Sequence, residues 1–150
     1  IDGIIFDFDG VLTDNNVYVS SEGNEMVRCN RSDGYSFKIL KKLGLQIFIL
    51  SSETNDVVKK RGEKLKIKTI SGSKDKKRDL LRLCKNYGLS PKRLIYVGND
   101  INDIDVMRIC GLSFAVNDAV EKVKKAADII LTSNGGEMVA REILNNYLEY

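Results

Sequence analysis

The feature that most constrains the fold is the alternation of short apolar runs with longer segments of helical period. The strand-like runs are rich in Ile, Val, Leu and Phe, and they cover residues 4–8, 46–50, 67–70, 94–97, 112–116 and 129–131. The segments between them are predicted to be helical, near residues 34–43, 54–65, 76–87, 102–110, 119–126 and 136–148. Strands that alternate with helices indicate βαβ units, in which helices cover both faces of a parallel sheet. The sequence therefore predicts an α/β fold.

One segment interrupts this alternation. Residues 17–20 and 26–28 are rich in residues that favour strands, and Glu22-Gly23-Asn24 lies between them. This pattern predicts a small β-hairpin just after the first strand. The sequence of 150 residues has one proline and no stretch that resembles an interdomain linker. We therefore expect a single domain over residues 1–150.

Histidine is absent from the sequence. Its absence excludes catalytic triads with a His base and metal sites with His ligands, so acid–base chemistry falls mainly to carboxylates. The three scattered cysteines favour reduced thiols in a cytoplasmic protein over a disulfide framework. The longest apolar runs are too short to span a bilayer, and no signal peptide is visible, so we expect no membrane partner.

Two carboxylates follow the first predicted strand, two residues apart, in Asp7-Phe8-Asp9-Gly10. Side chains at this spacing on a strand point to the same side, and parallel sheets bind ligands at the carboxyl ends of their strands. A simple turn is the alternative, because Asp and Gly are common turn residues. An apolar strand that ends in Asp-x-Asp-Gly favours a functional site.

The segment from Asp7 to Asp14 resembles the first motif of phosphatases of the haloacid dehalogenase superfamily. Over its whole length the chain resembles the small branch without a cap domain that contains 3-deoxy-manno-octulosonate 8-phosphate phosphatases. Residues 135–142 support the likeness to this branch. The chain is especially similar to the phosphatase-like domain attached to many bacterial acylneuraminate cytidylyltransferases, on the evidence of residues 24–34 and 98–103. The resemblance implies the haloacid dehalogenase fold: a three-layer sandwich with a mostly parallel, Rossmann-like sheet and no cap domain.

The resemblance also implies an enzyme, a Mg²⁺-dependent phosphatase with Asp7 as the nucleophile that forms a phosphoaspartate. Asp9 would act first as a general acid and then as a general base. Mg²⁺ would bind Asp7 through its carboxylate and Asp9 through its backbone carbonyl. A dehalogenase needs neither Asp9 nor the metal, so a phosphatase is favoured. The expected substrate is a sugar acid phosphate, of the 3-deoxy-octulosonate 8-phosphate or nonulosonate 9-phosphate type.

Later motifs of the same family supply further candidates. Ser51 would donate a hydrogen bond to a phosphoryl oxygen, although a Ser after a strand is also a common helix cap. The family pattern selects Lys76, among three neighbouring lysines, as the residue that neutralises the phosphate and the nucleophile. Asp33, Gly34 and Ser52 are expected to bind the substrate.

The fourth motif departs from the usual pattern. Asn99 stands where the family generally has a metal-binding Asp. An amide oxygen can bind Mg²⁺ but brings no charge, so weaker metal binding is expected. Asp100 and Asp103 are the alternative ligands, by way of water.

The expected partners and the competing hypotheses follow from the same residues. Between Lys59 and Arg78 there are ten basic and two acidic residues, with no interleaved aromatic residue, which favours a solvated surface over a nucleic-acid site. The family likeness implies a homotetramer in which the hairpin covers a neighbour's site, and a fused or associated cytidylyltransferase. The alternative function is a non-catalytic module that helps such an enzyme to oligomerise or regulates it. A phospho-receiver domain ranks last, because no Asp ends the second or third strand.

Overall fold

The computed structural model describes residues 1–148. Its main sheet has six parallel strands in the order β5-β4-β1-β6-β7-β8. Their bounds are β1 (Gly3–Phe6), β4 (Gln46–Leu50), β5 (Lys68–Ile70), β6 (Leu94–Gly98), β7 (Leu112–Ala115) and β8 (Ile129–Ile130). The first strand is therefore central, between β4 and β6, and the strands on its two sides bring distant parts of the chain to the same sheet edge.

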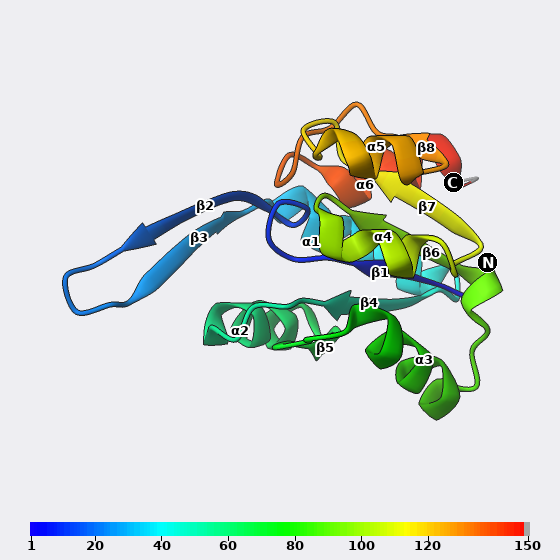
Figure 1. Ribbon diagram of the computed structural model, residues 1–150, viewed down its shortest axis with the longest axis horizontal. Helices are drawn as coiled ribbons and strands as arrows, with labels where there is room; N and C mark the ends of the chain where they lie inside the picture. Colours follow the sequence, from blue (N-terminus) through cyan, green and yellow to red (C-terminus); the bar gives the residue numbers. More distant parts are fainter. Residues whose placement is uncertain (149–150) are drawn as a thin grey trace.

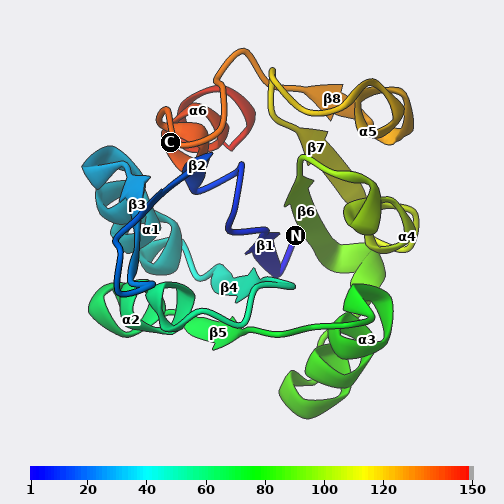
Figure 2. The ribbon, with the colours of Figure 1, turned by 60° about the vertical axis from the view of Figure 1, so that its left-hand side comes forward.

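Helices cover both faces of this sheet (Figure 2). One face carries α1 (Arg31–Lys42), α2 (Asp56–Leu65) and α6 (Val139–Tyr147), and the other carries α3 (Lys76–Tyr87), α4 (Ile104–Met107) and α5 (Glu121–Ala126). Two short 3-10 turns, Pro91–Arg93 and Ile101–Asp103, complete the helical elements. The predicted three-layer α/β sandwich is confirmed, and no cap domain is inserted within residues 1–148.

The apolar runs form strands because the sheet is buried on both faces, so that successive side chains all enter the core. All residues of β1 are buried, and Phe6 packs edge-on against Phe37 of α1 with their ring centroids 5.2 Å apart. Fully burying a side chain of this size contributes roughly 1.5–3 kcal/mol, which makes the position of β1 difficult to change. The residues that follow β1 thus have a rigid support.

Several boundaries differ from those predicted. The first strand ends at Phe6 and not at Phe8, because the chain turns there and the Phe8 carbonyl accepts hydrogen bonds from Leu12 N and Thr13 N. The helix predicted near 102–110 is instead the turn Ile101–Asp103 followed by the short α4. The helix predicted from 54 begins at Asp56, since Asn55 caps its first turn.

The predicted hairpin consists of β2 (Thr13–Val19) and β3 (Glu25–Cys29), which pair antiparallel in a second sheet. Figure 1 shows that it projects away from the body of the molecule. Four apolar side chains on it are mostly exposed: Val17, Tyr18, Val19 and Met26. Across residues 1–148, none of the helices combines the length and the apolar character that crossing a membrane requires.

Candidate active site

Asp7 lies directly after β1, at the carboxyl end of the sheet. Its backbone N–H donates to the Val97 carbonyl of β6, and its Oδ1 accepts a hydrogen bond of 2.7 Å from the Phe8 N–H. The chain then turns through Gly10, whose φ of +80° is a left-handed conformation that glycine adopts without strain. The side chain of Asp7 is thus fixed in a tight loop, with only 5% of the residue exposed.

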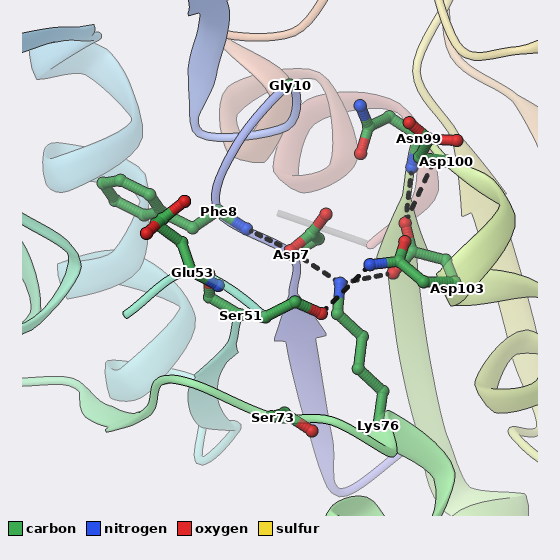
Figure 3. Close-up of polar contacts among 12 residues, drawn as sticks. Asp7, Phe8, Gly10, Ser51, Glu53, Ser73, Lys76, Asn99, Asp100 and Asp103 are labelled. Atoms are coloured by element: carbon green, nitrogen blue, oxygen red, sulfur yellow. Dashed lines mark hydrogen bonds and ion pairs between the residues drawn. The ribbon is translucent and has the colours of Figure 1, made fainter. Parts of the chain in front are cut away.

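The side chain of Lys76 contacts Asp7 from the start of helix α3. Lys76 is the first residue of α3, which Asp75 caps by accepting from the Arg78 N–H. The Lys76 Nζ lies 2.8 Å from Asp7 Oδ1 and 2.8 Å from Asp103 Oδ1 (Figure 3). Lys76 is buried, whereas Lys74 and Lys77 are exposed. The structure therefore brings the lysine that the family pattern selects into contact with the candidate nucleophile.

Asp103 accepts four hydrogen bonds within the chain. Its Oδ2 accepts from the N–H groups of Asn99 at 2.9 Å and Asp100 at 3.1 Å, and its Oδ1 accepts from Tyr96 at 2.6 Å as well as from Lys76. A side chain at Gly98 would meet Asp103 at 2.7 Å, so this approach requires glycine. These four donors occupy both oxygens of the buried carboxylate, which disfavours direct coordination of a metal by Asp103. That Asp103 contributes to the metal site by way of water stays a prediction.

Asn99 offers the oxygen that Asp103 does not. Its Oδ1 is buried without a hydrogen-bond partner, and such an atom is costly unless a ligand or ion satisfies it. A side chain at Gly10 would overlap the Asn99 amide, so the amide packs directly on the nucleophile loop. In Figure 3 Asn99 lies on the side of Asp7 opposite Lys76. Within residues 1–148, no three His, Cys or acidic side chains converge as a metal site, so a metal here would need this amide and backbone oxygen.

Asp7, Lys76 and Asn99 line one cavity of about 330 Å³ at the carboxyl edge of the sheet. Its lining residues are polar except for one valine, and they are Asp7, Asp9, Asn15, Val17, Ser51, Ser52, Glu53, Lys76, Asn99, Asp100 and Asn102. Ser51 Oγ accepts from the Glu53 N–H, which leaves its own O–H free to donate to an anion. Asn55, not Ser51, caps α2, so the capping alternative for Ser51 does not apply.

Burial is the largest influence on the pKa of Asp7 and on the pKa of Asp9. It raises the pKa of Asp7 to about 7, helped by the negative charge of Asp103 and opposed by Lys76. Burial also raises the pKa of Asp9, with a further contribution from Glu53. For Lys76, burial alone would lower the pKa, but Asp7 and Asp103 raise it above its ordinary value. A cation bound at Asp7 would favour the carboxylate form.

Asp33 and Gly34 lie outside the lining of this cavity. Asp33 Oδ1 accepts a 2.8 Å hydrogen bond from the Ala140 N–H and so joins α1 to the start of α6. Burial raises the pKa of Asp33 to about 6. Gly34 packs against the side chain of Leu65 in α2. Their role in binding the substrate stays a prediction, and no contact within this chain supports it.

Sequence reasoning did not single out five residues that belong to the site. Four of them line the cavity: Asn15, Val17, Glu53 and Asn102. The fifth, Tyr96, reads as a core residue because it lies in the apolar run of β6. A buried tyrosine needs a partner for its hydroxyl, and this requirement is the one signal that could have pointed to Asp103.

A family model described as haloacid dehalogenase-like hydrolase matches residues 47–143. The 3-deoxy-D-manno-octulosonate 8-phosphate phosphatase of Haemophilus influenzae is 32% identical over 147 residues, which cover 97% of this chain and 82% of that protein. A structure of a HAD family hydrolase from Streptomyces avermitilis superposes with a TM-score of 0.93 at 41% identity, covering 96% of this chain and 83% of that chain.

A second solved structure is that of the 3-deoxy-D-manno-octulosonate 8-phosphate phosphatase from Moraxella catarrhalis, in complex with a magnesium ion, a phosphate ion and a KDO molecule. It superposes with a TM-score of 0.91 at 30% identity and covers 95% of this chain and 83% of that chain. The family model matches well over half of this chain, and the relative and the two solved structures are matched over most of both chains. The chain belongs to the haloacid dehalogenase-like hydrolases, as a phosphatase of the branch that contains the 3-deoxy-D-manno-octulosonate 8-phosphate phosphatases.

Proposed function

We propose that this chain is a Mg²⁺-dependent phosphomonoesterase that hydrolyses a sugar acid phosphate through a phosphoaspartate on Asp7. The observation that carries the proposal is the contact of Lys76 Nζ with Asp7 Oδ1 at 2.8 Å, in a cavity that Asp9 also lines. The substrate class rests on the phosphatases of Haemophilus influenzae and Moraxella catarrhalis. It is a keto sugar acid phosphate of the 3-deoxy-octulosonate 8-phosphate or nonulosonate 9-phosphate type.

In the first displacement an Asp7 carboxylate oxygen attacks phosphorus, and the bond between phosphorus and the sugar oxygen breaks. The raised pKa of Asp9 favours the protonated form, which donates its proton to the leaving alkoxide. Ser51 and Lys76 hold the phosphoryl oxygens by hydrogen bonding and charge. Lys76 already neutralises part of the charge on Asp7, which lowers the repulsion between the nucleophile and the incoming dianion.

In the second displacement Asp9, now a carboxylate, removes a proton from water. The water oxygen attacks phosphorus, the bond between phosphorus and Asp7 breaks, and inorganic phosphate leaves. The enzyme returns to its starting state with the Asp7 carboxylate again paired with Lys76. Asp9 thus serves both steps, as acid and then as base, and one half-buried carboxyl group suffices for the proton transfers.

The donor set around Asp7 fits Mg²⁺, which prefers oxygen ligands. The Asp7 carboxylate, the Asp9 backbone carbonyl and the Asn99 amide oxygen would hold it, with Asp100 at the edge of the same cavity. A bound Mg²⁺ supplies positive charge to the phosphoryl oxygens. The unpartnered Asn99 Oδ1 is the observation that supports this site, because the amide has an acceptor that nothing in residues 1–148 satisfies.

A panel of phosphate esters tests the proposal. Phosphate release is measured with 3-deoxy-octulosonate 8-phosphate, a nonulosonate 9-phosphate, glucose 6-phosphate as a neutral sugar control, and p-nitrophenyl phosphate. We expect the highest kcat/KM for one of the two sugar acids, and complete loss of release when the metal is chelated. A preference for glucose 6-phosphate would contradict the substrate class, and metal-independent release would contradict the cofactor.

The alternative is a non-catalytic module of an acylneuraminate cytidylyltransferase. None of the relatives named above is such an enzyme, and Asp7, Asp9, Ser51 and Lys76 all line one cavity, which supports the phosphatase. Absence of phosphate release from all four esters, at saturating Mg²⁺ and with a folded protein, would favour the module. The homotetramer with the hairpin over a neighbouring site remains part of the proposal and is addressed by the predictions below.

A further inference from the structure

Tyr96 places a hydroxyl group beneath the floor of the active-site cavity. The residue is fully buried in β6, and its backbone is held between β1 and β7. Its hydroxyl donates to Asp103 Oδ1 at 2.6 Å, a short distance typical of a bond to an ionised carboxylate. Tyr96 lies two residues before Gly98, so the two positions face the same side of the strand. The strand therefore delivers this donor to Asp103 from a fixed point.

The oxygen that accepts from Tyr96 also accepts from Lys76. Asp103 Oδ1 lies 2.6 Å from the tyrosine oxygen and 2.8 Å from Lys76 Nζ. The same ammonium lies 2.8 Å from Asp7 Oδ1. One positive charge is thus divided between two buried carboxylates. The Asp7 Oδ1 also accepts from the Phe8 N–H, whereas the Asp103 Oδ1 also accepts from the Tyr96 hydroxyl. Figure 3 shows the Lys76 ammonium group between the carboxylates of Asp7 and Asp103.

The physical effect of the hydroxyl follows from this sharing. A hydrogen bond from Tyr96 stabilises the negative charge of Asp103 and weakens its attraction for Lys76. Without the hydroxyl, Asp103 Oδ1 would have Lys76 as its remaining donor, in surroundings where a partly satisfied carboxylate is costly. The ammonium group would then move toward Asp103 and away from Asp7. The ring of Tyr96 fills core volume, but its hydroxyl decides how the charge of Lys76 is shared.

We propose that Tyr96 is a positioning residue of the phosphatase reaction, which acts through Asp103 to keep Lys76 directed at Asp7 and at the incoming phosphoryl group. The proposal deepens, and rests on, the function proposed above. Tyr96 touches neither the cavity nor a reacting atom, so its contribution is entirely indirect. A phenylalanine at this position would preserve the packing and remove only the donor.

The variant Tyr96→Phe tests this, with Tyr87→Phe as the matched control. Tyr87 lies on α3 and is 43% exposed, so the same atom is removed outside the network. Binding of inorganic phosphate in the presence of Mg²⁺ is measured by calorimetry, and kcat and KM are measured with the best ester. We expect Tyr96→Phe to weaken phosphate binding and lower kcat by roughly tenfold each, the scale of one hydrogen bond to a charged group. Tyr87→Phe should match the wild type.

A double-mutant cycle separates positioning from packing. Asp103→Asn removes the charged acceptor through which Tyr96 acts, so adding Tyr96→Phe to it should change phosphate binding by less than about twofold. A second loss as large as in the wild-type background would show that Tyr96 acts by packing and would overturn the proposal. Unchanged phosphate binding and kcat in Tyr96→Phe would overturn it too.

The phosphate measurement keeps this inference distinct from the proposed function. If the wild type releases phosphate from none of the esters, the function fails, but the comparison of phosphate binding still decides the role of Tyr96. If the wild type turns over an ester and Tyr96→Phe equals it, only the positioning role fails. Absence of phosphate binding by the folded wild type would overturn the positioning role, because Lys76 would then serve no anion.

Discussion

The carboxyl edge of the main sheet and the β2–β3 hairpin differ in which side chains they bury. At the sheet edge, Asp7, Lys76 and Asp103 are buried, and each makes short contacts within the chain. On the hairpin, Tyr18 and Met26 are 66% and 67% exposed although both are apolar. At the sheet edge, the polar side chains find their partners within the chain. On the hairpin, apolar side chains stay exposed in the single chain. The proposed catalytic residues thus lie within one chain, whereas the proposed cover of the cavity by the hairpin would need a second chain.

The largest effect is expected at the sheet edge, from Asp7→Asn. The amide cannot form the phosphoaspartate, so turnover should fall by more than roughly 10³-fold, as for other catalytic nucleophiles. Steady-state phosphate release measures it, and circular dichroism checks the fold. A folded variant that keeps more than a few per cent of the wild-type rate would remove Asp7 from the role of nucleophile.

Asp9→Asn should have the next largest effect. Loss of general acid–base catalysis typically costs about 10²–10⁴-fold in rate. Because the backbone carbonyl is the proposed ligand at this position, Mg²⁺ should still bind, which calorimetry with Mg²⁺ measures directly. Recovery of full activity at saturating Mg²⁺ would instead identify the Asp9 side chain as a metal ligand.

A substitution on the hairpin is expected to change the oligomeric state of the protein. Met26→Glu places a charge on an exposed apolar surface of a two-stranded ribbon, which is marginal on its own. We expect a smaller sedimentation coefficient than that of the wild type and a several-fold lower kcat/KM. Leu81→Glu on α3 is the control, since Leu81 is 47% exposed and outside the hairpin. A wild type that sediments as a monomer at micromolar concentration would contradict the proposed tetramer.

Asn99→Asp should change metal affinity more than turnover. An added anionic oxygen favours Mg²⁺, so the concentration for half-maximal activity should fall by about tenfold. The sign of the effect on kcat is open, because the new charge also repels Asp7 and the phosphate. Rates measured against Mg²⁺ for both proteins decide this, and identical curves would place Asn99 outside the metal site and favour Asp100.

The smallest effect on activity is expected from Asp33→Asn. The pKa of Asp33 in the folded chain, about 6, lies above its ordinary value of 3.8. Its contribution to stability is therefore fully present below about pH 4 and is lost as the pH rises through 6, by at most about 3 kcal/mol. The difference in unfolding free energy between the variant and the wild type should follow that window. A large rise in KM without this change would support the predicted role in substrate binding.

The order of strands and helices was predictable because it depends on local apolar patterns. Asp7 and Asp9 were also predictable, since they follow a buried strand in a recognisable motif. Tyr96 and Asp103 were not, because their roles depend on a contact between β6 and the turn after it. The division of the predicted helix near 102–110 has the same cause: the Asp103 carboxylate binds the N–H groups of Asn99 and Asp100 and tightens the chain there.

Residue patterns alone predicted the alternation of strands and helices, the hairpin, and two candidate site residues, Asp7 and Lys76. Each of these depends on residue types within a short stretch or on a motif. The folded chain was needed to show that Asp103 accepts from Lys76, that the Asn99 Oδ1 is buried without a hydrogen-bond partner, and that Asp33 joins α1 to α6. The physical reason is that the role of a polar side chain depends on its burial and on the donors around it. Packing brings those donors from residues as far as 107 positions away.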